Sequence, residues 1–487
     1  MRNPKARMSV LLIFWGLFLA PAFSLTRAEP ARTARHTSGG GLVVSISDIH
    51  FNPFYDPKLV ASLIQSDYAK WQTIFARSLV AGYGSHSADT NYNLFKSALE
   101  NIYLRAPRPD FIVIAGDFLA HDFQETYAKL TGSSDPKAVD SFIDKTIAFV
   151  TLMIARRFPK TPVYPALGNN DSYCGDYRVE PGGEFLRATA RTWRGLLNSA
   201  SNARVFLRTF PVSGSYSAIA PHNKTHRIIV LNTTFFSSNY KNTCGDPKAE
   251  PGNDEMKWLA TELQKAAAAK ERVWLVYHIP VGIDVYSSVN NGQPGQAVLL
   301  WQSAYNQQFI KLVTQNSNLI VAAFAGHIHM DSFQLIQPTN NAPTSFVHIT
   351  PAISPLFGNN PAFDVFTYNR RSAALRDYSA YYFDLSSPAS QKNAPVKWQK
   401  EYSFAQAFGQ PAFSASTLQA VYKLMPADQN GYLTKYETFY NVSNTASPGI
   451  DANNWRAYWC GIANLTVPEY LGCISNSTKQ QSGMLRR

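Results

Sequence analysis

The sequence contains few cysteines, few charged residues and only one long apolar run. Its 487 residues include four Cys, and Asp, Glu, Lys and Arg together account for 16% of the chain. A hydrophobic content of 45% argues against an intrinsically disordered protein, because disordered chains combine high net charge with few apolar residues. No internal repeat is visible. The composition is typical of a packed globular enzyme, long enough for one large domain and a smaller one.

The one long apolar run lies near the N-terminus, from Val10 to Ala20. Three basic residues precede it within the first seven positions, and small residues follow it as far as Ala28. This order predicts a secretory signal peptide over residues 1–28. The run is short for a membrane span, although an uncleaved anchor is the alternative. We therefore expect a secreted or periplasmic protein with no transmembrane segment after cleavage.

The chain has an excess of basic residues, with 45 Lys and Arg against 33 Asp and Glu. The net charge of +12 would favour anionic substrates or peripheral contact with an anionic lipid surface. The basic residues are scattered and form no dense Lys/Arg run, so specific nucleic-acid binding is not expected. A solvated basic surface is the simpler interpretation.

An exported chain with four cysteines is expected to form two disulfides. Cys460 and Cys473 would close a short loop, which leaves Cys174 to pair with Cys244, although the sequence alone does not fix the pairing. The chain would also be a glycoprotein if its source organism glycosylates. The glycosylation sequons begin at Asn223, Asn232, Asn441, Asn464 and Asn476.

Apolar stretches alternate with helical patterns along most of the chain. We expect strands over 42–46, 111–115, 162–167, 215–219, 227–231, 273–277, 319–324, 345–349 and 380–385. We expect helices over 93–104, 136–157, 183–197, 254–270, 299–315, 418–425, 435–440 and 455–460. Alternation favours a sheet with helices on both faces, and the late strand pairs suggest a second, more antiparallel sheet. The predicted fold is α/β, a four-layer sandwich of two mixed sheets flanked by helices.

The chain divides into four predicted parts. The signal peptide, 1–28, is followed by a flexible lead-in over 29–40 with several glycines. The catalytic domain would span 41–398, ending after a stretch rich in Ser, Pro, Ala and Asn at 386–395. A small helical C-terminal subdomain would span 399–487 and would be held together by its own disulfide.

Polar residues with metal-binding side chains stand where the predicted strands end. The pair His327 and His329, in Gly-His-Ile-His, directly follows the apolar run 319–324. The other candidates follow other strands and are Asp48, His50, Asp117, Asn169 and His278. Because open α/β sheets collect their sites at the carboxyl ends of strands, these loops can converge on one point. The set contains no thiolate, which argues against a closed structural zinc site and favours two hydrolytic divalent metals.

The ordered set resembles the motif series of the calcineurin-like metallophosphoesterases, which is D-x-H, G-D, G-N-H-[DE], H and G-H-x-H. The resemblance implies two metal ions that share Asp117. The other ligands it implies are Asp48, His50 and His329 for the first metal, and Asn169, His278 and His327 for the second. Zinc is favoured for both, because imidazole-rich sites in exported proteins suit it.

A closer resemblance is to the acid sphingomyelinase-like phosphodiesterases. It is carried by Ser47-Asp48-Ile49-His50-Phe51-Asn52, by Gly116-Asp117-Phe118-Leu119-Ala120-His121-Asp122, and by the stretches 349–355 and 359–363. The C-terminal cysteine pair fits this family, and the resemblance covers nearly the whole chain after the signal peptide. Only about a dozen residues separate the predicted signal peptide from the first strand, so we expect no saposin domain of the kind found in animal acid sphingomyelinases.

Asn170 departs from the pattern of this family, which has His here, thought to contact phosphate or protonate the leaving group. An amide can donate a hydrogen bond to phosphate but cannot act as an acid near neutral pH. His121, four residues after Asp117, is therefore our candidate for the acid or the principal phosphate ligand, and a structural loop histidine is the alternative. Asp171 is expected to orient neighbouring groups.

The predicted protein is a phosphoric ester hydrolase, a binuclear-metal phosphodiesterase in which a metal-bound hydroxide attacks phosphorus and His121 protonates the leaving alkoxide. The expected substrates are small phosphodiesters, nucleotides or choline phosphates. Candidates to bind a base or a choline group are Phe54, Tyr55, Tyr173 and Phe357. The alternatives are a true sphingomyelin phosphodiesterase that releases phosphocholine, a phosphomonoesterase, and a binding protein on an inactive scaffold.

Overall fold

The computed structural model describes residues 39–484 except 291–295, 338–342, 393–395 and 448, with side chains described as far as residue 476. The predicted signal peptide and most of the predicted lead-in lie outside the described residues. Within the described part of the chain, no helix is both long enough and apolar enough to cross a membrane.

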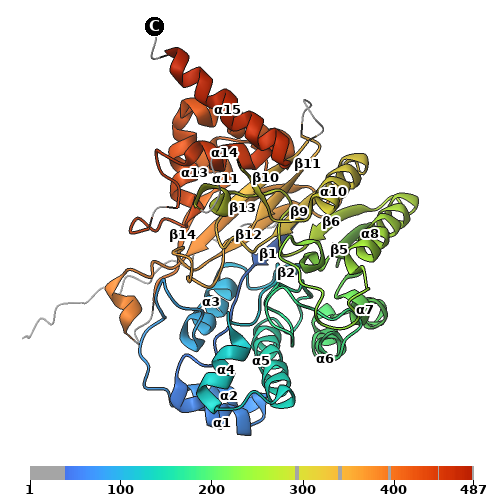
Figure 1. Ribbon diagram of the computed structural model, residues 1–487, viewed down its shortest axis with the longest axis vertical. Coiled ribbons are helices and arrows are strands. Elements are labelled where there is room, and N and C mark those ends of the chain that lie inside the picture. Colours follow the sequence, from blue (N-terminus) through green and yellow to red (C-terminus); the bar gives the residue numbers. More distant parts are fainter. Residues whose placement is uncertain (1–38, 291–295, 338–342, 393–395, 448, 485–487) are drawn as a thin grey trace, which may run out of the picture. The chain divides into compact units, whose positions relative to one another are not determined.

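The first mixed sheet has the strand order β14-β13-β12-β1-β2-β3 (Figure 1). Its strands are β1 (Gly40–Ile46), β2 (Phe111–Ile114), β3 (Val163–Pro165), β12 (Ala362–Asn369), β13 (Leu375–Tyr382) and β14 (Gln399–Ser403). Strands β1, β2 and β3 run parallel, whereas β12 pairs antiparallel with β1 and begins an antiparallel meander through β13 and β14. The parallel part therefore directs the carboxyl ends of three strands to one edge.

The second mixed sheet has the order β10-β11-β9-β6-β5-β4. Its strands are β4 (Tyr216–Ile219), β5 (His226–Val230), β6 (Arg272–Val276), β9 (Ile320–Ala325), β10 (Ser332–Ile336) and β11 (Ser345–Ile349). The four central strands are parallel, and β4 and β10 are antiparallel to their neighbours. A short ribbon of β7 (Ile283–Asp284) and β8 (Val298–Leu299) lies outside both sheets.

Helices flank the two sheets. Those before the second sheet are α1 (Val60–Gln65), α2 (Trp71–Phe75), α3 (Tyr92–Arg105), α4 (Phe123–Thr131), α5 (Pro136–Arg157), α6 (Glu184–Trp193) and α7 (Ala200–Ser213). Those that follow are α8 (Pro251–Ala268), α9 (Val285–Asn290), α10 (Ser303–Gln315), α11 (Phe404–Phe408), α12 (Ala415–Leu424), α13 (Tyr432–Tyr440), α14 (Trp455–Ala463) and α15 (Val467–Met484). Helix α3 contacts β12 of the first sheet, and α7 and α10 contact the second. The predicted α/β sandwich is therefore confirmed.

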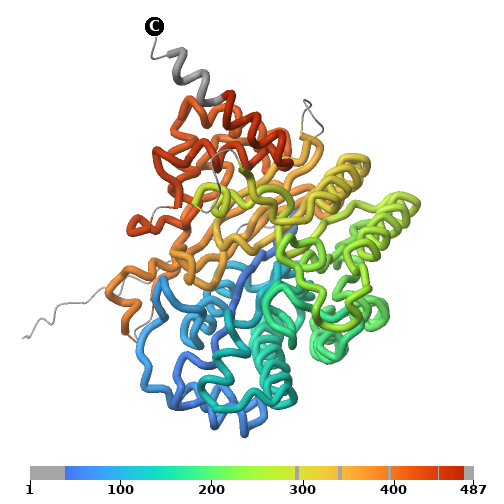
Figure 2. The backbone as a smooth tube through the Cα atoms, viewed as in Figure 1, coloured from blue at the N-terminus to red at the C-terminus, as the bar shows by residue number. Residues whose placement is uncertain are grey.

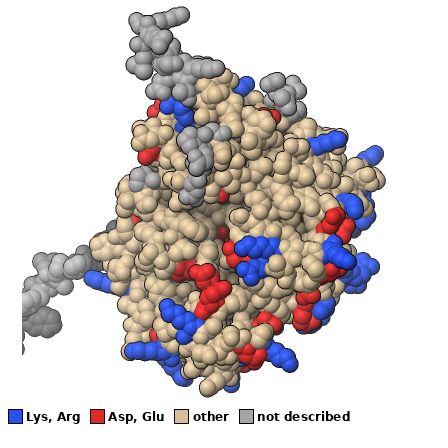
Figure 3. Space-filling model, in the orientation of Figure 1, with Lys and Arg blue, Asp and Glu red and all other residues tan. Residues whose placement is uncertain are grey.

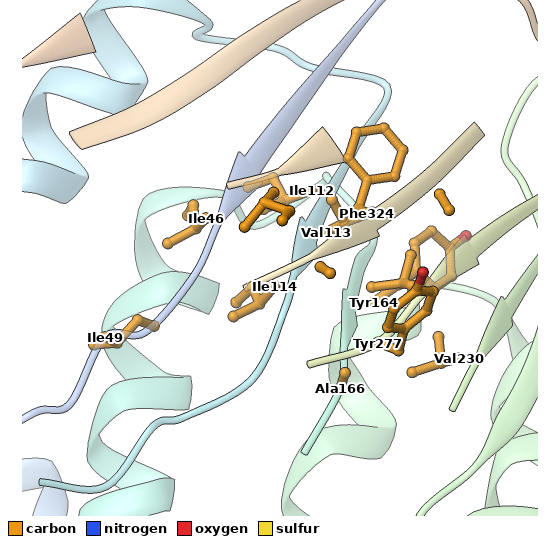
Figure 4. Close-up of a cluster of buried hydrophobic side chains, with 14 of the residues drawn as sticks. Ile46, Ile49, Ile112, Val113, Ile114, Tyr164, Ala166, Val230, Tyr277 and Phe324 are labelled. Carbon is orange, nitrogen blue, oxygen red and sulfur yellow. The ribbon is translucent and has the colours of Figure 1, made fainter. Parts of the chain in front are cut away.

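The inner faces of the two sheets pack against each other through buried aromatic side chains. The Trp274 ring on β6 lies 5.3 Å from Phe111 on β2 and 5.4 Å from Tyr368 on β12. Figure 4 shows aliphatic residues of β2 beside Phe324 of β9 in the same core. Full burial of each such side chain contributes about 1.5–3 kcal/mol to folding stability. This interface therefore fixes the position of the strand ends of one sheet relative to those of the other.

The strands late in the chain do not form a sheet of their own, which corrects our expectation. Strands β10 and β11 extend the second sheet, while β12, β13 and β14 complete the first. The sequence pattern does not reveal β12, because Asp364 interrupts its apolar residues. The buried Asp364 is compensated in three dimensions by the Nε2 atom of His348 on β11, which lies 2.7 Å from its carboxylate.

The C-terminal helices pack on the second sheet, where α14 contacts β10 (Figure 2). A disulfide joins Cys460 of α14 to Cys473 of α15. Strand β14, however, begins at Gln399 and pairs with β13 of the first sheet, so the predicted subdomain would begin with a strand of that sheet. The division of the chain into domains at this point stays a prediction.

Acidic and basic side chains are interspersed on the face of the molecule drawn in Figure 3. No large patch of a single charge covers that face. The arrangement there fits a solvated, mixed surface, and no basic groove of the kind that binds nucleic acid is seen on it.

Candidate active site

The seven predicted metal ligands all follow strands that run parallel. The first sheet supplies Asp48, His50, Asp117 and Asn169 after β1, β2 and β3, and the second sheet supplies His278, His327 and His329 after β6 and β9. The structure brings these loops together between the two sheets. The Nε2 atom of His329 lies 3.5 Å from the Asp48 carboxylate, although 281 positions separate them in the chain.

The backbone of these loops is strained. The backbone angle φ is positive at five of the seven residues, being 48° at Asp48, 40° at His50, 56° at Asp117, 73° at His327 and 64° at His329. Non-glycine residues rarely adopt this conformation, and such strain gathers at functional sites. The surrounding core must hold these residues in place.

Two glycines of the motifs are required by close approach of other side chains. A Cβ atom at Gly326 would collide with the side chains of Ser47 and Asp48, and one at Gly168 would collide with Asp117. The glycine in Gly-His-Ile-His therefore lets β9 reach the loop after β1. The glycine in Gly-Asn lets the loop after β3 reach the loop after β2.

Asp117 lies between two groups of ligands. One carboxylate oxygen is 3.3 Å from Nε2 of His50 and 3.1 Å from Nε2 of His278. Burial disfavours ionisation of Asp117, but the charges of His278 and His50 outweigh burial and hold its pKa well below the usual range. A carboxylate in this position can bridge two cations, which is the role that the resemblance implies.

The imidazoles are oriented by the backbone. Nδ1 of His50 lies 2.8 Å from the carbonyl of Leu119, and Nδ1 of His278 lies 2.6 Å from that of Ala115. A carbonyl only accepts hydrogen bonds, so each Nδ1 carries a proton, and each Nε2 is the nitrogen left to bind a metal ion. The Nε2 atoms of His50 and His329 face each other at 3.2 Å, an arrangement that a cation would stabilise.

The donor set fits two divalent metal ions. Ligand atoms of Asp48, His50 and Asp117 lie within 4.8 Å of one another. In the described part of the chain, Nδ1 of His329 is a buried polar atom without a hydrogen-bond partner. Mixed carboxylate, amide and imidazole ligands without a thiolate suit hydrolytic metals with open positions.

Asn169 is held by a residue that the sequence analysis missed. Its Oδ1 atom lies 2.9 Å from Nε2 of His278, and its Nδ2 atom donates to the Asp176 carboxylate at 2.7 Å. A carboxylate accepts only from the amide nitrogen, so Asp176 fixes the orientation of the amide and turns its oxygen toward His278. No local pattern marks Asp176, since its role depends on the fold of the loop after β3.

Asn170 is turned toward Asp117. Its backbone N–H and its Nδ2 group donate to the two carboxylate oxygens at 2.9 and 3.0 Å. Asp171 accepts from the backbone N–H groups of Phe118, Leu119 and Gly168, and so ties the loop after β3 to the loop after β2. Burial, with the charge of Asp117, raises the pKa of Asp171 to about 6.

His121 lies beside the metal ligands and is held by Asp89. The His121 ring stacks on His50 with centroids 4.0 Å apart, and its side chain is 27% exposed. Its Nδ1 lies 3.1 Å from the Asp89 carboxylate, which also accepts from the hydroxyl of Ser354 at 3.0 Å. Asp89 was not predicted, because no motif surrounds it. Ser354 belongs to the stretch 349–355 that carried the family resemblance.

Two cavities lie near this centre. One of about 610 Å³ includes Asp117, His121 and Asn169 in its wall, and one of about 580 Å³ includes Asn170. The walls share Asp176 and Tyr177. The larger cavity therefore leaves open space beside Asp117 and His121.

Most of the aromatic residues proposed to bind substrate lie elsewhere. Phe54 is buried in the core against Phe123, and the Tyr173 hydroxyl donates to Asp144. Neither these two nor Tyr55 belongs to the wall of either cavity, whereas Phe357 does. Phe357 is 54% exposed, and its ring meets the edge of His329 at a centroid distance of 4.6 Å.

The cysteines pair as expected, Cys174 with Cys244 and Cys460 with Cys473, which suits an oxidising compartment. Two of the sequons offer a buried side chain, because Asn232 is 0% exposed and Asn441 is 3% exposed. Asn476 is exposed. Glycosylation of Asn232 or Asn441 would require the chain to be unfolded locally.

The carboxylates and imidazoles lie around Asp117, where the carboxyl ends of the parallel strands of both sheets come together. This arrangement is typical of a binuclear metallophosphoesterase. Residues 42–331 match the family described as Calcineurin-like phosphoesterase, and residues 341–480 match the Acid sphingomyelin phosphodiesterase C-terminal region. The chain therefore belongs to the calcineurin-like phosphoesterases, in their acid sphingomyelinase-like branch. This confirms the resemblance that the motifs indicated and the prediction of a phosphoric ester hydrolase.

Several named relatives are similar over most of their length. The human "Acid sphingomyelinase-like phosphodiesterase 3b" is 27% identical over 95% of this chain and 94% of its own. The rat "Cyclic GMP-AMP phosphodiesterase SMPDL3A" is 25% identical over 97% of this chain and 99% of its own. The "Sphingomyelinase phosphodiesterase C" of Dictyostelium discoideum is 25% identical over 83% of this chain and 86% of its own.

Proposed function

We propose that this chain is an exported, zinc-dependent phosphodiesterase that hydrolyses small soluble phosphodiesters of nucleotide or choline type. The observation that supports a diester is the cavity of about 610 Å³ beside Asp117, which is large enough for a phosphate group with two substituents. A phosphodiester has two substituents and needs space on both sides of phosphorus, whereas a monoester needs one. The names of the relatives, which include cyclic GMP-AMP and sphingomyelin phosphodiesterases, support the same class of substrate.

The metal ligands proposed are Asp48, His50, Asp117 and His329 for one ion, and Asp117, Asn169, His278 and His327 for the other. Two bound ions would supply Lewis-acid polarisation of the phosphate and a water molecule of lowered pKa. The chain's own contribution is to hold the imidazole lone pairs in place through the carbonyls of Leu119 and Ala115. Asp176 does the same for the oxygen of Asn169.

His121 is the proposed acid. As an oxygen from water bonds to phosphorus, the bond from phosphorus to the leaving oxygen breaks, and the proton on Nε2 of His121 moves to that oxygen. Asp89 accepts from the other ring nitrogen, which keeps Nε2 available to the cavity and stabilises the protonated imidazole. Asn170 cannot supply this proton, and its amide group is already bonded to Asp117.

A substrate panel tests the proposal on the protein refilled with zinc. Bis-p-nitrophenyl phosphate, CDP-choline, ATP, cyclic GMP-AMP and liposomal sphingomyelin are compared by kcat/KM, with p-nitrophenyl phosphate as the monoester control. We expect the soluble diesters to exceed both the monoester and the liposomal lipid. A preference for liposomes would identify a sphingomyelinase, a preference for the monoester a phosphatase, and bound zinc without any turnover an inactive scaffold.

A further inference from the structure

Tyr177, in the loop after β3, lies beside the proposed metal ligand His327. Its Oη atom is 3.3 Å from Nε2 of His327, and the two rings stand perpendicular with their centroids 6.1 Å apart. The two residues are 150 positions apart in the chain. Tyr177 also forms part of the wall of both cavities. This contact joins a ligand of the second sheet to the loop that carries Asn169.

The backbone around Tyr177 holds the residue in this position. The angle φ is 53° at Tyr177, which is rare for an aromatic residue. Its N–H donates to the carbonyl of Asn169 at 3.0 Å, and its carbonyl accepts from the N–H of Lys241 at 3.0 Å. The disulfide between Cys174 and Cys244 joins the same two segments. The surrounding chain therefore imposes a strained conformation that places the hydroxyl beside His327.

The contact decides which nitrogen of His327 can bind a metal ion. A neutral imidazole has one proton and one lone pair on its two ring nitrogens. If the Tyr177 hydroxyl donated to Nε2, the lone pair would be used there and Nδ1 would carry the proton. His327 would then have no lone pair for a metal. If Nε2–H donates to the hydroxyl oxygen, the lone pair of Nδ1 stays free, so only this arrangement suits a ligand.

His327 then differs from His50 and His278. The Nδ1 atoms of those two residues face carbonyl groups, which leaves Nε2 to bind a metal ion. In His327 the partner lies at Nε2, which leaves Nδ1. Metal-binding histidines depend on a partner at the second nitrogen, because that partner fixes the tautomer and the direction of the ring. For His327 this partner is Tyr177.

Adjacent residues of one loop thus contact two ligands of the same proposed ion. Asp176 accepts from the amide group of Asn169 at 2.7 Å, and Tyr177 contacts His327. Packing of the Tyr177 ring is the alternative explanation of its position. A phenylalanine would pack equally well, however, and packing accounts neither for the hydroxyl beside Nε2 nor for the strained backbone.

We infer that Tyr177 is a positioning residue for the second metal ion. Its hydroxyl oxygen accepts a hydrogen bond from Nε2–H of His327, which leaves Nδ1 of this ligand to bind the ion. The inference rests on the ligand set of the proposed function. It adds to that set a residue that acts through His327 and not on the substrate.

Tyr177→Phe tests this role, because it removes the hydroxyl and keeps the ring. We expect the Kd of one of the two zinc ions to rise about tenfold or more, and the Kd of the other to stay within about twofold. Competition with a chelator measures both constants, and an unchanged Tm shows that the fold is intact. Equal zinc Kd values in the wild type and in Tyr177→Phe would overturn the inference.

Tyr173→Phe is the matched control, since it makes the same change in the same loop. The Tyr173 hydroxyl donates to Asp144 at 2.6 Å, and the residue belongs to the wall of neither cavity. Both zinc Kd values should therefore match those of the wild type. A loss of zinc affinity as large as that in Tyr177→Phe would indicate a general effect on the loop and would also overturn the inference.

Magnetic resonance of the zinc-loaded protein reads the tautomer directly. Long-range proton–nitrogen correlation spectra, recorded with isotope-labelled histidine, show which ring nitrogen carries the proton, and His327→Gln identifies the signal. We expect the proton on Nε2 in His327 but on Nδ1 in His50 and His278. A proton on Nδ1 of His327 would overturn the inference. Zinc bound as expected, without hydrolysis of any diester, would contradict only the proposed function.

Discussion

The Asp89 carboxylate accepts two hydrogen bonds from His121, one from the ring Nδ1 at 3.1 Å and one from the backbone N–H at 2.9 Å. The two residues come from separate loops, 32 positions apart. Burial favours the neutral form of Asp89, but the hydrogen bond from His121 and the charges of His50 and His121 outweigh it and lower its pKa to about 2. Asp89 is therefore ionised at physiological pH and orients the proposed acid.

Replacement of His121 should impair substrates according to their leaving group. For an alkyl diester such as glycerophosphocholine, whose leaving alkoxide needs a proton on departure, we expect His121→Ala to lower kcat/KM about a hundredfold or more. For bis-p-nitrophenyl phosphate, whose leaving group departs as an anion, the loss should stay below about tenfold. Equal losses on both substrates would contradict the role as an acid.

Asp89→Asn should reproduce this pattern more weakly, because it removes the charge that stabilises the imidazolium while retaining an oxygen that accepts from Nδ1. We expect the alkaline limb of the pH profile, where the acid loses its proton, to move to lower pH for alkyl diesters. Ser354→Ala, which loses only the hydroxyl that donates to Asp89, is the matched control and should leave the profile in place.

Asp117→Asn should lose metal and activity together. The carboxylate lies between His50 and His278, and an amide cannot bridge two cations as strongly. We expect the zinc content to fall by at least one ion per chain and kcat/KM to fall more than about a hundredfold. Atomic emission analysis of the dialysed protein measures the zinc, and full activity in this variant would contradict the shared-ligand arrangement.

Asn170→His should add an acid where the family has one. In the His121→Ala background we expect this second substitution to recover about tenfold in kcat/KM on alkyl diesters, because an imidazole can donate the proton that an amide cannot. Asn170→Gln, also an amide, is the control and should recover nothing. Failure of the histidine variant to exceed the glutamine variant would show that position 170 does not face the leaving group.

Stability should decline from mildly acidic toward alkaline pH because of Glu255. This residue of α8 is buried, and one oxygen accepts from the Ser215 hydroxyl and the Asn232 N–H at 2.5 and 2.6 Å. Burial raises its pKa from 4.5 to about 8. The folded state thus binds the proton more tightly than the unfolded state, and the stabilisation present below pH 4.5 is lost as pH rises through 8.

Urea denaturation at pH 5 and pH 8 measures this loss. At about 1.4 kcal/mol per pKa unit, we expect Glu255→Gln to remove a few kcal/mol of the pH dependence. The exposed Glu250 at the start of the same helix provides the control, since Glu250→Gln should leave the dependence unchanged. An identical pH dependence in wild type and Glu255→Gln would show that this carboxyl is ionised in the folded protein.

The two disulfides should contribute differently to function. Removal of Cys174–Cys244, which spans 70 residues, should cost about 4 kcal/mol of folding free energy, and removal of Cys460–Cys473, which spans 13, about 3 kcal/mol. Cys174 stands in the loop that carries Asn169 and Asp176, so only the first pair should also lower zinc affinity. Serine variants of each pair, compared by Tm and zinc Kd, test this difference.

Much of the fold was predictable from local patterns. The strands β1, β2, β5, β6 and β9 are apolar runs, and helix α5 begins at Pro136 with Asp135 as its cap, as expected. Strand β12 and helix α7 were missed for physical reasons. The buried Asp364 of β12 is tolerated only because His348 lies opposite, and Pro211 interrupts the pattern near the end of α7. The contact between Asp364 and His348 joins two different strands, so a short stretch of sequence does not reveal it.

The sequence by itself predicted the residues of the candidate metal centre, because each of them follows a strand and parallel strands deliver their carboxyl ends to one edge. Only the tertiary structure decided the surroundings of that centre. Asp89, Asp176 and Tyr177 are ordinary polar residues in the sequence, and each acquires its role from a partner that the folded chain places beside it. Periodicity reports which residues are buried within one element, whereas the contacts between elements depend on how the two sheets and the C-terminal helices pack.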